Sequence, residues 1–192
     1  MEERIVRYIK GGIEVKEKVL EKCISSIKEI VIATIETLRD GGKIILFGNG
    51  GSASEAEHFV CELVGKFFKK KKALPAIALS TNTSVITAVG NDFSFQEIFS
   101  REIEALGKEK DLAIGFSTPG NSENILRGIM TAKNKGMKTV GLSGCDGGKL
   151  KEIADICVIV PSFHSPHIQE AHVTIIHLIC ELVEEEFTSL DT

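Results

Sequence analysis

The stretch that decides the fold is IILFGNGGSASEAEHFVCE, residues 44–62. It opens with Ile44 to Phe47, the short unbroken apolar run that is typical of a strand buried on both faces of a parallel sheet. The glycine-rich turn at 48–51 then lets the backbone bend sharply and present N–H groups. We expect Ser52 to cap the helix that follows, whose first amides and positive dipole end suit a phosphate or another oxyanion.

Two side chains suited to proton transfer or metal binding follow on this helix. His58 and Glu62 are four residues apart, so they lie about 40° apart around a helix and share one face. A phosphate cradle followed by such a pair predicts a site for a phosphorylated small molecule.

A dinucleotide site is the competing interpretation, because Gly48, Gly50 and Ala53 satisfy the loose pattern G-x-G-x-x-G/A. Such a site also requires an acid near the end of the next strand, about 20 residues on, to hold the ribose hydroxyls. The next strand, residues 75–79, is followed by the segment STNTS, which has no carboxylate. The sequence therefore favours the phosphorylated small molecule.

The chain has 192 residues, of which 43% are hydrophobic and 26% charged. A chain of this length buries roughly 70% of the surface that its unfolded state exposes, so we expect one domain over residues 1–192. The formal net charge of −4 gives no general attraction to nucleic acid or anionic lipid, and we expect neither partner. We interpret the basic run at 69–72 as a solvated helix C-terminus, where cations oppose the dipole.

No run of 18 apolar residues and no charged-then-apolar leader occurs in the sequence. We therefore expect no membrane span and no secretory signal, and a cytoplasmic protein. The cysteines are scattered without a C-x-x-C pair, which indicates reduced core thiols rather than disulfides or a zinc knuckle: Cys23, Cys61, Cys145, Cys157 and Cys180.

Strand and helix signals alternate along the chain, as in right-handed βαβ crossovers on a parallel sheet. Short apolar runs predict strands at 44–48, 76–80, 112–117, 138–143 and 156–160. Helices are expected near 52–68, 83–89, 94–106, 122–135 and 148–154, with a closing helix near 168–187. We therefore expect a three-layer α/β/α sandwich with a five-stranded parallel sheet.

The first 40 residues form a helical extension to this α/β core, which spans residues 41–192. Their apolar residues recur at spacings near three and four, which is typical of amphipathic helices. We expect a short helix that breaks at Gly11-Gly12 and then a long one.

Ligands of open α/β sheets bind beyond the carboxyl ends of the strands. The loops that follow the first four expected strands are rich in hydroxyls and glycine, with almost no cationic side chain: GNGGS, STNTS, STPGNS and SGCDGG. Such residues make good turns and caps, which would explain any one loop. Four successive loops are better explained by a site that holds phosphate through hydroxyls, amides and helix dipoles.

The chain resembles phosphoheptose isomerases, members of the sugar-isomerase (SIS) domain superfamily, in five motifs that keep their order over nearly the whole chain: GNGGSASEAEHF, GNDFSFQEIFSREIEALGKEKD, STPGNSENIL, LSGCDGG and IQEAHVTIIHLICELVE. The resemblance implies the SIS fold and conversion of sedoheptulose 7-phosphate into D-glycero-D-manno-heptose 7-phosphate, the first step towards the activated heptoses of lipopolysaccharide. It also implies a cytoplasmic homotetramer with active sites at subunit interfaces, and in some members a zinc ion, one per subunit.

Carried over residue by residue, the resemblance assigns the base to Glu62 and its partner acid to His177. It assigns substrate contacts to Asn49, Gly50, Gly51, Ser52, Asn91, Asp92, Ser117, Thr118, Pro119, Ser122 and Gln169. The positions that bind metal in some members are His58, Glu62, Gln169 and His177.

Three positions depart from the family's pattern. Pro119 replaces a serine of the phosphate loop, which removes one hydroxyl and one N–H. Lys66 stands where arginine is usual, which exchanges a planar bidentate fork for a point charge. His167 also stands where arginine is general. We expect Pro119 to weaken the binding of phosphate to this loop. We expect none of the three departures to affect the proposed acid and base.

Interconversion of an aldose and a ketose moves a proton between two carbons, which a carboxylate can do, and moves protons on and off the oxygens, which a histidine can do near neutral pH. By residue type alone, Glu62 suits a helix surface and His177, in an apolar series, suits a core. We expect His164, His167 and His172 in loops or at the surface. Two other functions stay open: a non-catalytic paralogue that binds the replication initiator, and an isomerase or sensor for another sugar phosphate.

Helix geometry adds one expectation about assembly. In an unbroken helix Gln169 and His177 would stand roughly 12 Å apart along the axis and about 80° apart around it. Zinc requires donor atoms about 2 Å from a common centre. We therefore expect that the last helix begins after Gln169, or that His177 meets Glu62 of a neighbouring subunit in a tetramer.

Overall fold

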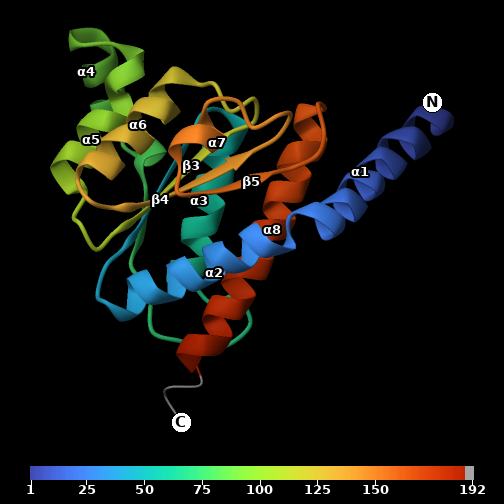
Figure 1. Cartoon of the computed structure of the whole chain (residues 1–192), viewed down its shortest axis with the longest axis horizontal. Helices are drawn as coiled ribbons and strands as arrows, with labels where there is room; N and C mark the ends of the chain where they lie inside the picture. The colour runs from blue at the N-terminus through green and yellow to red at the C-terminus, as the bar shows by residue number, and fades with distance from the viewer. Residues whose placement is uncertain (189–192) are drawn as a thin grey trace.

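The computed structural model describes residues 1–188 and contains a five-stranded, all-parallel sheet (Figure 1). The strand order is β2-β1-β3-β4-β5, and every neighbouring pair is parallel. The bounds are Ile44–Gly48 for β1, Ala76–Ala78 for β2, Leu112–Ser117 for β3, Lys138–Ser143 for β4 and Ile156–Ile159 for β5. β2 is shorter than expected because the chain turns into a 3₁₀ helix, η1 (Leu79–Thr81), at its end.

Helices cover both faces of the sheet, which confirms the three-layer sandwich. Because successive side chains of a strand point to opposite faces, Ile44 and Leu46 of β1 pack with one layer, and Ile45 and Phe47 with the other. The first layer holds α2 (Ile24–Arg39), α3 (Gly51–Val64) and α8 (Ser165–Thr188). The second holds α5 (Ile98–Leu106), α6 (Glu123–Asn134) and α7 (Leu150–Ile153), and beside α5 lie α4 (Thr83–Asp92) and η2 (Phe95–Glu97).

The N-terminal helix α1 (Glu2–Lys22) runs through Gly11-Gly12 without a break, so the expected interruption there is wrong. α1 ends at Lys22 instead, and Cys23 separates it from α2. The two glycines let α1 pass close to α8: a Cβ on Gly12 would lie 2.8 Å from Glu170 Oε2. Beyond this crossing α1 extends away from the sheet (Figure 1).

Two further differences in helix boundaries bear on the site. α8 begins at Ser165, before Gln169. α3 ends at Val64, so the basic run at 69–72 lies in the loop after it. The interpretation of that run as a helix C-terminus is therefore wrong, and Lys71, whose side chain is 1% exposed, is not solvated either.

All cysteines within residues 1–188 are free thiols. Cys23 and Cys180 are buried, but Cys61 is exposed, so the expectation of core thiols is wrong for that residue. Among residues 1–188, no helix is both long and apolar enough to cross a membrane.

Candidate functional site

The loops that follow β1 and β3 lie side by side at the carboxyl edge of the sheet. β1 pairs with β2 on one side and β3 on the other, so this is the point at which the strand order reverses, where ligands of such sheets bind. Asn49, after β1, and Asn124, in the first turn of α6, exchange two amide hydrogen bonds of 2.9 and 2.8 Å. This pair fixes the two loops relative to each other.

The first turn of α3 begins at Gly51, and its N-cap is Gly50, so the expectation that Ser52 caps this helix is wrong. Gly50 has a φ of 54°, a conformation that favours glycine. A Cβ on Gly51 would lie 2.4 Å from the Gln169 amide nitrogen. Glycine at this position therefore lets Gln169 of α8 lie against the N-terminus of α3.

The loop after β3 gathers hydroxyls at the start of α6. Ser117 and Ser122 lie with their Oγ atoms 3.0 Å apart, and the Ser122 N–H donates to Ser117 Oγ. Ser122 is the N-cap of α6, Thr118 is half-buried and Pro119 is exposed. Gly120 turns the loop with a φ of 72°. The hydroxyls thus lie where the first amides and the dipole of α6 favour an anion.

The second part of the site joins α3 to α8. His58 and Glu62 of α3 and His177 of α8 place one ligand atom each within 4.8 Å of the others. The two histidine Nε2 atoms are 2.8 Å apart, and His58 Nε2 is 3.7 Å from Glu62 Oε1. All three residues belong to one chain, so the expectation that His177 meets Glu62 of a neighbouring subunit is wrong.

The donor set of this cluster fits zinc. Two imidazoles and a carboxylate are the protein ligands of some catalytic zinc sites, with Zn–N distances of about 2.0–2.1 Å. Two such nitrogens around a tetrahedral ion stand roughly 3.3 Å apart. The 2.8 Å between the histidine nitrogens is close to that spacing, so a small side-chain movement suffices.

Gln169 lies two turns before His177 in the unbroken α8, so the expectation that this helix begins after Gln169 is also wrong. It lines a cleft of about 560 Å³ together with His58, Gly51 and Glu55. The structure therefore brings Gln169 and His58 to one cleft between α3 and α8.

Asn91 and Asp92, two of the expected substrate contacts, do not line this cleft. They lie at the C-terminal end of α4, both exposed, and Asn91 Nδ2 donates to Asp92 Oδ1 at 2.7 Å. In Figure 1, α4 and α8 lie well apart. Within one subunit, the helix that carries Asn91 and Asp92 therefore lies apart from the helix that carries His177.

His172 and Glu55 form a buried pair beside the cleft that the sequence analysis did not predict. His172 is 0% exposed, so its expected place in a loop or at the surface is wrong. Its Nε2 donates to the Ser143 carbonyl at 3.1 Å, and its Nδ1 lies 3.5 Å from Glu55 Oε1, a carboxylate that is also buried. The spacing from Ile168 and Ile175 puts His172 on the buried stripe of α8, a signal that was readable.

The other two histidines lie near α1. His164 is exposed, as expected, whereas His167 is buried and packs its ring against Tyr8 of α1, with centroids 4.5 Å apart. Close to the cluster, burial and then the nearby Glu62 carboxylate raise the pKa of the Cys180 thiol. The thiol therefore stays protonated near neutral pH.

Comparison with known proteins agrees with this geometry. A family model described as the SIS domain matches residues 7–144, and the parallel sheet with a hydroxyl-lined carboxyl edge is that of a SIS-domain protein. The phosphoheptose isomerase of Helicobacter pylori strain P12 is 48% identical over 174 residues, 91% of each chain. That of Clostridium acetobutylicum is 48% identical over 188 residues, 97% of this chain and 96% of the relative.

A solved structure agrees with the sequence comparison. The phosphoheptose isomerase from Neisseria gonorrhoeae has a TM-score of 0.91 and 34% identity, and the match covers 96% of this chain and 98% of that chain. The chain belongs to the phosphoheptose isomerase family.

Proposed function

We propose that this isomerase converts sedoheptulose 7-phosphate into D-glycero-D-manno-heptose 7-phosphate through an enediol. The observation that carries the proposal is the approach of Glu62 to His177, a carboxylate and an imidazole from two helices. Hydroxyl-lined loops at the carboxyl edge of the sheet supply the polar groups for a phosphate. Isomerisation of a phosphorylated ketose requires these two kinds of group in one place.

In the proposed mechanism Glu62 removes a proton from carbon 1 of the ketose. The electrons of that C–H bond form the double bond between carbons 1 and 2, and His177 donates a proton to the oxygen of carbon 2. The imidazole then takes the hydroxyl proton at carbon 1, and Glu62 returns its proton to carbon 2, which gives the aldose. Each group ends the cycle in its starting protonation state, as a catalyst must.

The phosphate of the substrate would bind at the start of α6. Ser117, Thr118 and Ser122 supply hydroxyls there, and the helix supplies free N–H groups and its dipole. Asn49, Gly50, Gly51 and Ser52 would border the sugar from the N-terminus of α3. Pro119, which has no N–H and no hydroxyl, reduces the donors that this loop offers.

A zinc ion, one per subunit, would be held by His58, Glu62 and His177, with the Gln169 amide from the same cleft. When bound, such an ion polarises the substrate's carbonyl as a Lewis acid. Glu62 belongs to both the acid–base pair and the ligand set, so metal and proton transfer share this carboxylate.

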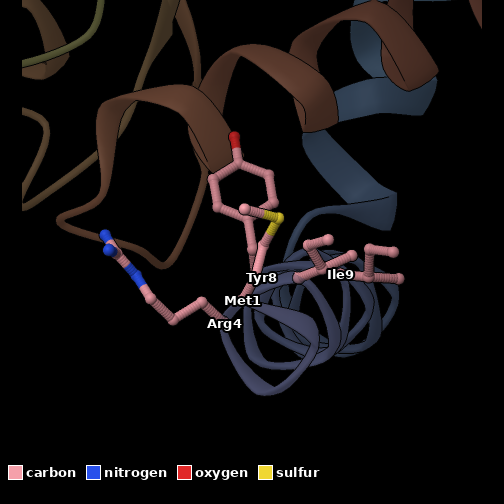
Figure 2. Close-up of a pocket in the computed structure, with 5 residues that line it drawn as sticks. Met1, Arg4, Tyr8 and Ile9 are labelled. Carbon is pink, nitrogen blue, oxygen red and sulfur yellow. The ribbon is translucent and has the colours of Figure 1, made fainter.

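We also propose a homotetramer. α1 buries only Gly12 and Val15, while Ile5, Ile9 and Ile13 are each more than half exposed. Met1, Arg4, Tyr8 and Ile9 line an open hollow along α1 (Figure 2). Exposed apolar faces of this kind indicate a protein partner, and a second copy of the chain is the one we propose.

The assembly would also supply the missing substrate contacts. α4 has no buried residue and lies apart from its own chain's α8, and Asn91 and Asp92 at its end are exposed. We propose that they reach the site of a neighbouring subunit, which keeps the site interfacial although Glu62 and His177 share one chain. The product would feed lipopolysaccharide synthesis in the cytoplasm.

The experiment that tests the proposed function compares the purified parent with Glu62→Gln in an assay with sedoheptulose 7-phosphate. Loss of a positioned base reduces turnover by roughly two to four orders of magnitude. Glu57→Gln, an exposed position on the same helix, is the control. A Glu62→Gln variant with more than a tenth of the parent's turnover would exclude Glu62 as the base.

A further inference from the structure

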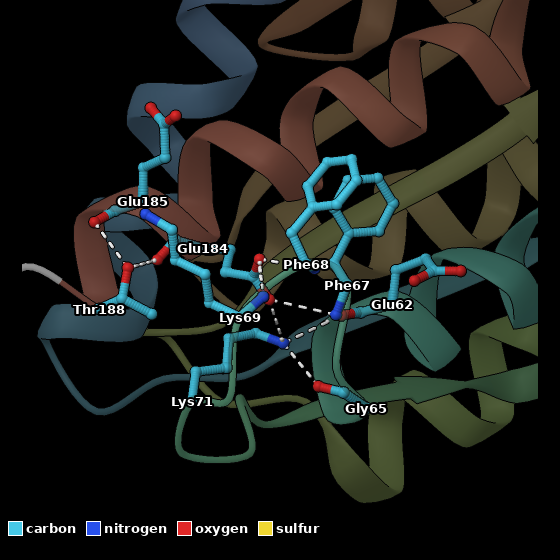
Figure 3. A network of polar contacts seen from close by, with 9 residues as sticks. All are labelled: Glu62, Gly65, Phe67, Phe68, Lys69, Lys71, Glu184, Glu185 and Thr188. Carbon is cyan, nitrogen blue, oxygen red and sulfur yellow. Dashed lines mark hydrogen bonds and ion pairs between the residues drawn. The ribbon is translucent and has the colours of Figure 1, made fainter.

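The loop after α3 directs three successive backbone N–H groups at one buried carboxylate. Phe67 N–H donates to Glu184 Oε1 at 3.1 Å, and Phe68 and Lys69 N–H donate to Oε2 at 2.8 Å each (Figure 3). Glu184 belongs to α8 and is 2% exposed. Burial alone would raise the pKa of this carboxyl, but the three N–H groups and Lys71 outweigh burial and hold the pKa below its ordinary value. The carboxylate is therefore charged near neutral pH.

Lys71 closes this arrangement from the other side. Its Nζ lies 3.6 Å from Glu184 Oε1 and donates to the carbonyl oxygens of Glu62 at 3.1 Å and Gly65 at 2.6 Å. These carbonyls belong to the last turn and the C-cap of α3. Carbonyls at the end of a helix have no N–H donor within that helix, so Lys71 supplies one. The side chains of Lys71 and Glu184 are 1% and 3% exposed. We call Glu184, Lys71 and the three N–H groups the Glu184 clamp.

The Glu184 clamp adjoins both proposed catalytic residues, at the backbone of Glu62 and at the ring of His177. The Glu62 carbonyl that Lys71 holds belongs to the proposed base. The Phe67 ring lies 5.7 Å, centroid to centroid, from the ring of His177. Glu184 follows His177 by seven residues, so both lie on one face of α8, about 10 Å apart along its axis. One carboxylate thus joins the end of α3 to the helix that carries His177.

We propose that Glu184 is a positioning residue for the isomerase reaction: through Lys71 it sets the last turn of α3 and so Glu62, and through Phe67 it sets the ring of His177. This inference rests on the proposed function for its kinetic consequence. Its structural consequence, the placement of Phe67 against His177, does not. Glu184 itself has no described contact with the cleft residues and acts through others.

A role in stability alone would give a different result. A residue that only holds the fold together changes the melting temperature and leaves the turnover of the folded fraction unchanged. A positioning residue lowers kcat more than it changes KM, because misplacement of reacting groups by about 1 Å can cost ~100-fold in rate. The split between kcat and KM is therefore the discriminating kinetic readout.

The test uses the full-length protein and two matched pairs. Glu184→Gln removes the clamp's charge, and Glu181→Gln makes the same change at an exposed position three residues earlier on α8. Lys71→Gln is paired with Lys72→Gln at the exposed neighbour, and Lys71→Arg keeps the charge. For each variant we would measure kcat and KM with sedoheptulose 7-phosphate. We would also record the His177 ring signal by NMR of ¹³C-histidine-labelled protein, assigned with His177→Asn.

We expect Glu184→Gln and Lys71→Gln to lower kcat at least tenfold with KM within threefold of the controls, and Lys71→Arg to recover part of the loss. The His177 ring signal moves in Glu184→Gln because the ring current of Phe67 shifts, and it stays in place in Glu181→Gln. A kcat within threefold of Glu181→Gln, or an unmoved His177 signal, overturns the proposal. If the parent does not turn over this substrate, the proposed function fails and the ring signal alone decides the clamp. If Glu184→Gln does not fold, the three lysine variants carry the test.

Discussion

His58 and His177 are 119 residues apart in the sequence, yet their Nε2 atoms lie 2.8 Å apart, the distance of a single hydrogen bond. One of the two nitrogens must donate and the other accept, or a cation must replace the shared hydrogen. With Glu62 Oε1 at 3.7 Å from His58 Nε2, the arrangement suits a divalent ion with nitrogen and oxygen ligands.

His58→Ala should weaken zinc binding by ~100-fold or more, because even the loss of a partner of a ligand typically costs 10–100-fold. Calorimetric titration of the metal-free protein with zinc measures the effect. His164→Ala, at an exposed loop histidine, is the control and should bind as the parent does. Equal affinity of His58→Ala and the parent would contradict the proposed ligand set.

Mixed oligomers of Glu62→Gln and His177→Ala subunits should stay inactive, because Glu62 and His177 meet within one chain and neither subunit type carries both. The measurement is the activity of the mixture after dissociation and reassembly. By contrast, mixtures of Glu62→Gln with an Asp92→Ala variant should recover activity if α4 serves a neighbour. Recovered activity in the first mixture would contradict the pairing within one chain.

Ser117→Ala and Ser122→Ala should each weaken substrate affinity by about 1–3 kcal/mol, the range for hydrogen bonds to charged groups. The reason is that hydroxyls, rather than lysines, surround the start of α6. Calorimetry with sedoheptulose 7-phosphate on the Glu62→Gln background measures binding without turnover. Equal affinity of the parent for sedoheptulose and its 7-phosphate would rule out phosphate recognition by this loop.

Glu102 of α5 should make stability depend on pH. Burial raises the pKa of this carboxyl from 4.5 to about 7, and within residues 1–188 its Oε1 has no hydrogen-bond partner. Between these values the folded state binds a proton that the unfolded state does not, so stability falls as pH rises through this window. Glu102→Gln should therefore gain about 1–3 kcal/mol over the parent at pH 8 and little at pH 4.5.

Urea unfolding at the two pH values, at one protein concentration, tests this prediction. The control is Glu104→Gln, an exposed carboxylate two residues away. A gain at pH 8 that is no larger than the gain at pH 4.5 would show that Glu102 is not protonated in the folded protein.

The fold was predictable because its signals are local. An apolar run such as Ile44 to Phe47 predicts a strand that is buried on both faces, and β1 is buried throughout. The glycines after it predict a turn, and α3 begins there. The break at Gly11-Gly12 was wrong because each helical glycine costs only about 1 kcal/mol, and at both positions a Cβ would crowd side chains of α8, so glycine here serves a helix crossing. Local propensity does not report such a crossing.

The candidate site was predictable in part. Spacing on one helix pairs His58 with Glu62, but no pattern in the sequence gives the position of α8 relative to α3. Both alternatives that we expected for His177, a later start of α8 and a partner in a neighbouring subunit, were therefore wrong. The Glu184 clamp had no local signal at all. Its carboxylate lies more than a hundred residues from the loop that it holds, and only the folded structure joins them.

Conversion of sedoheptulose 7-phosphate by the purified protein, followed by NMR of the sugar, is the measurement that decides the proposed activity. We expect D-glycero-D-manno-heptose 7-phosphate to form in the parent and in Glu57→Gln, and Glu62→Gln to form it at least a hundredfold more slowly. No aldose from the parent, with the phosphorylated ketose either unbound or bound without turnover, would contradict the isomerase activity and favour a non-catalytic paralogue or a protein for another sugar phosphate.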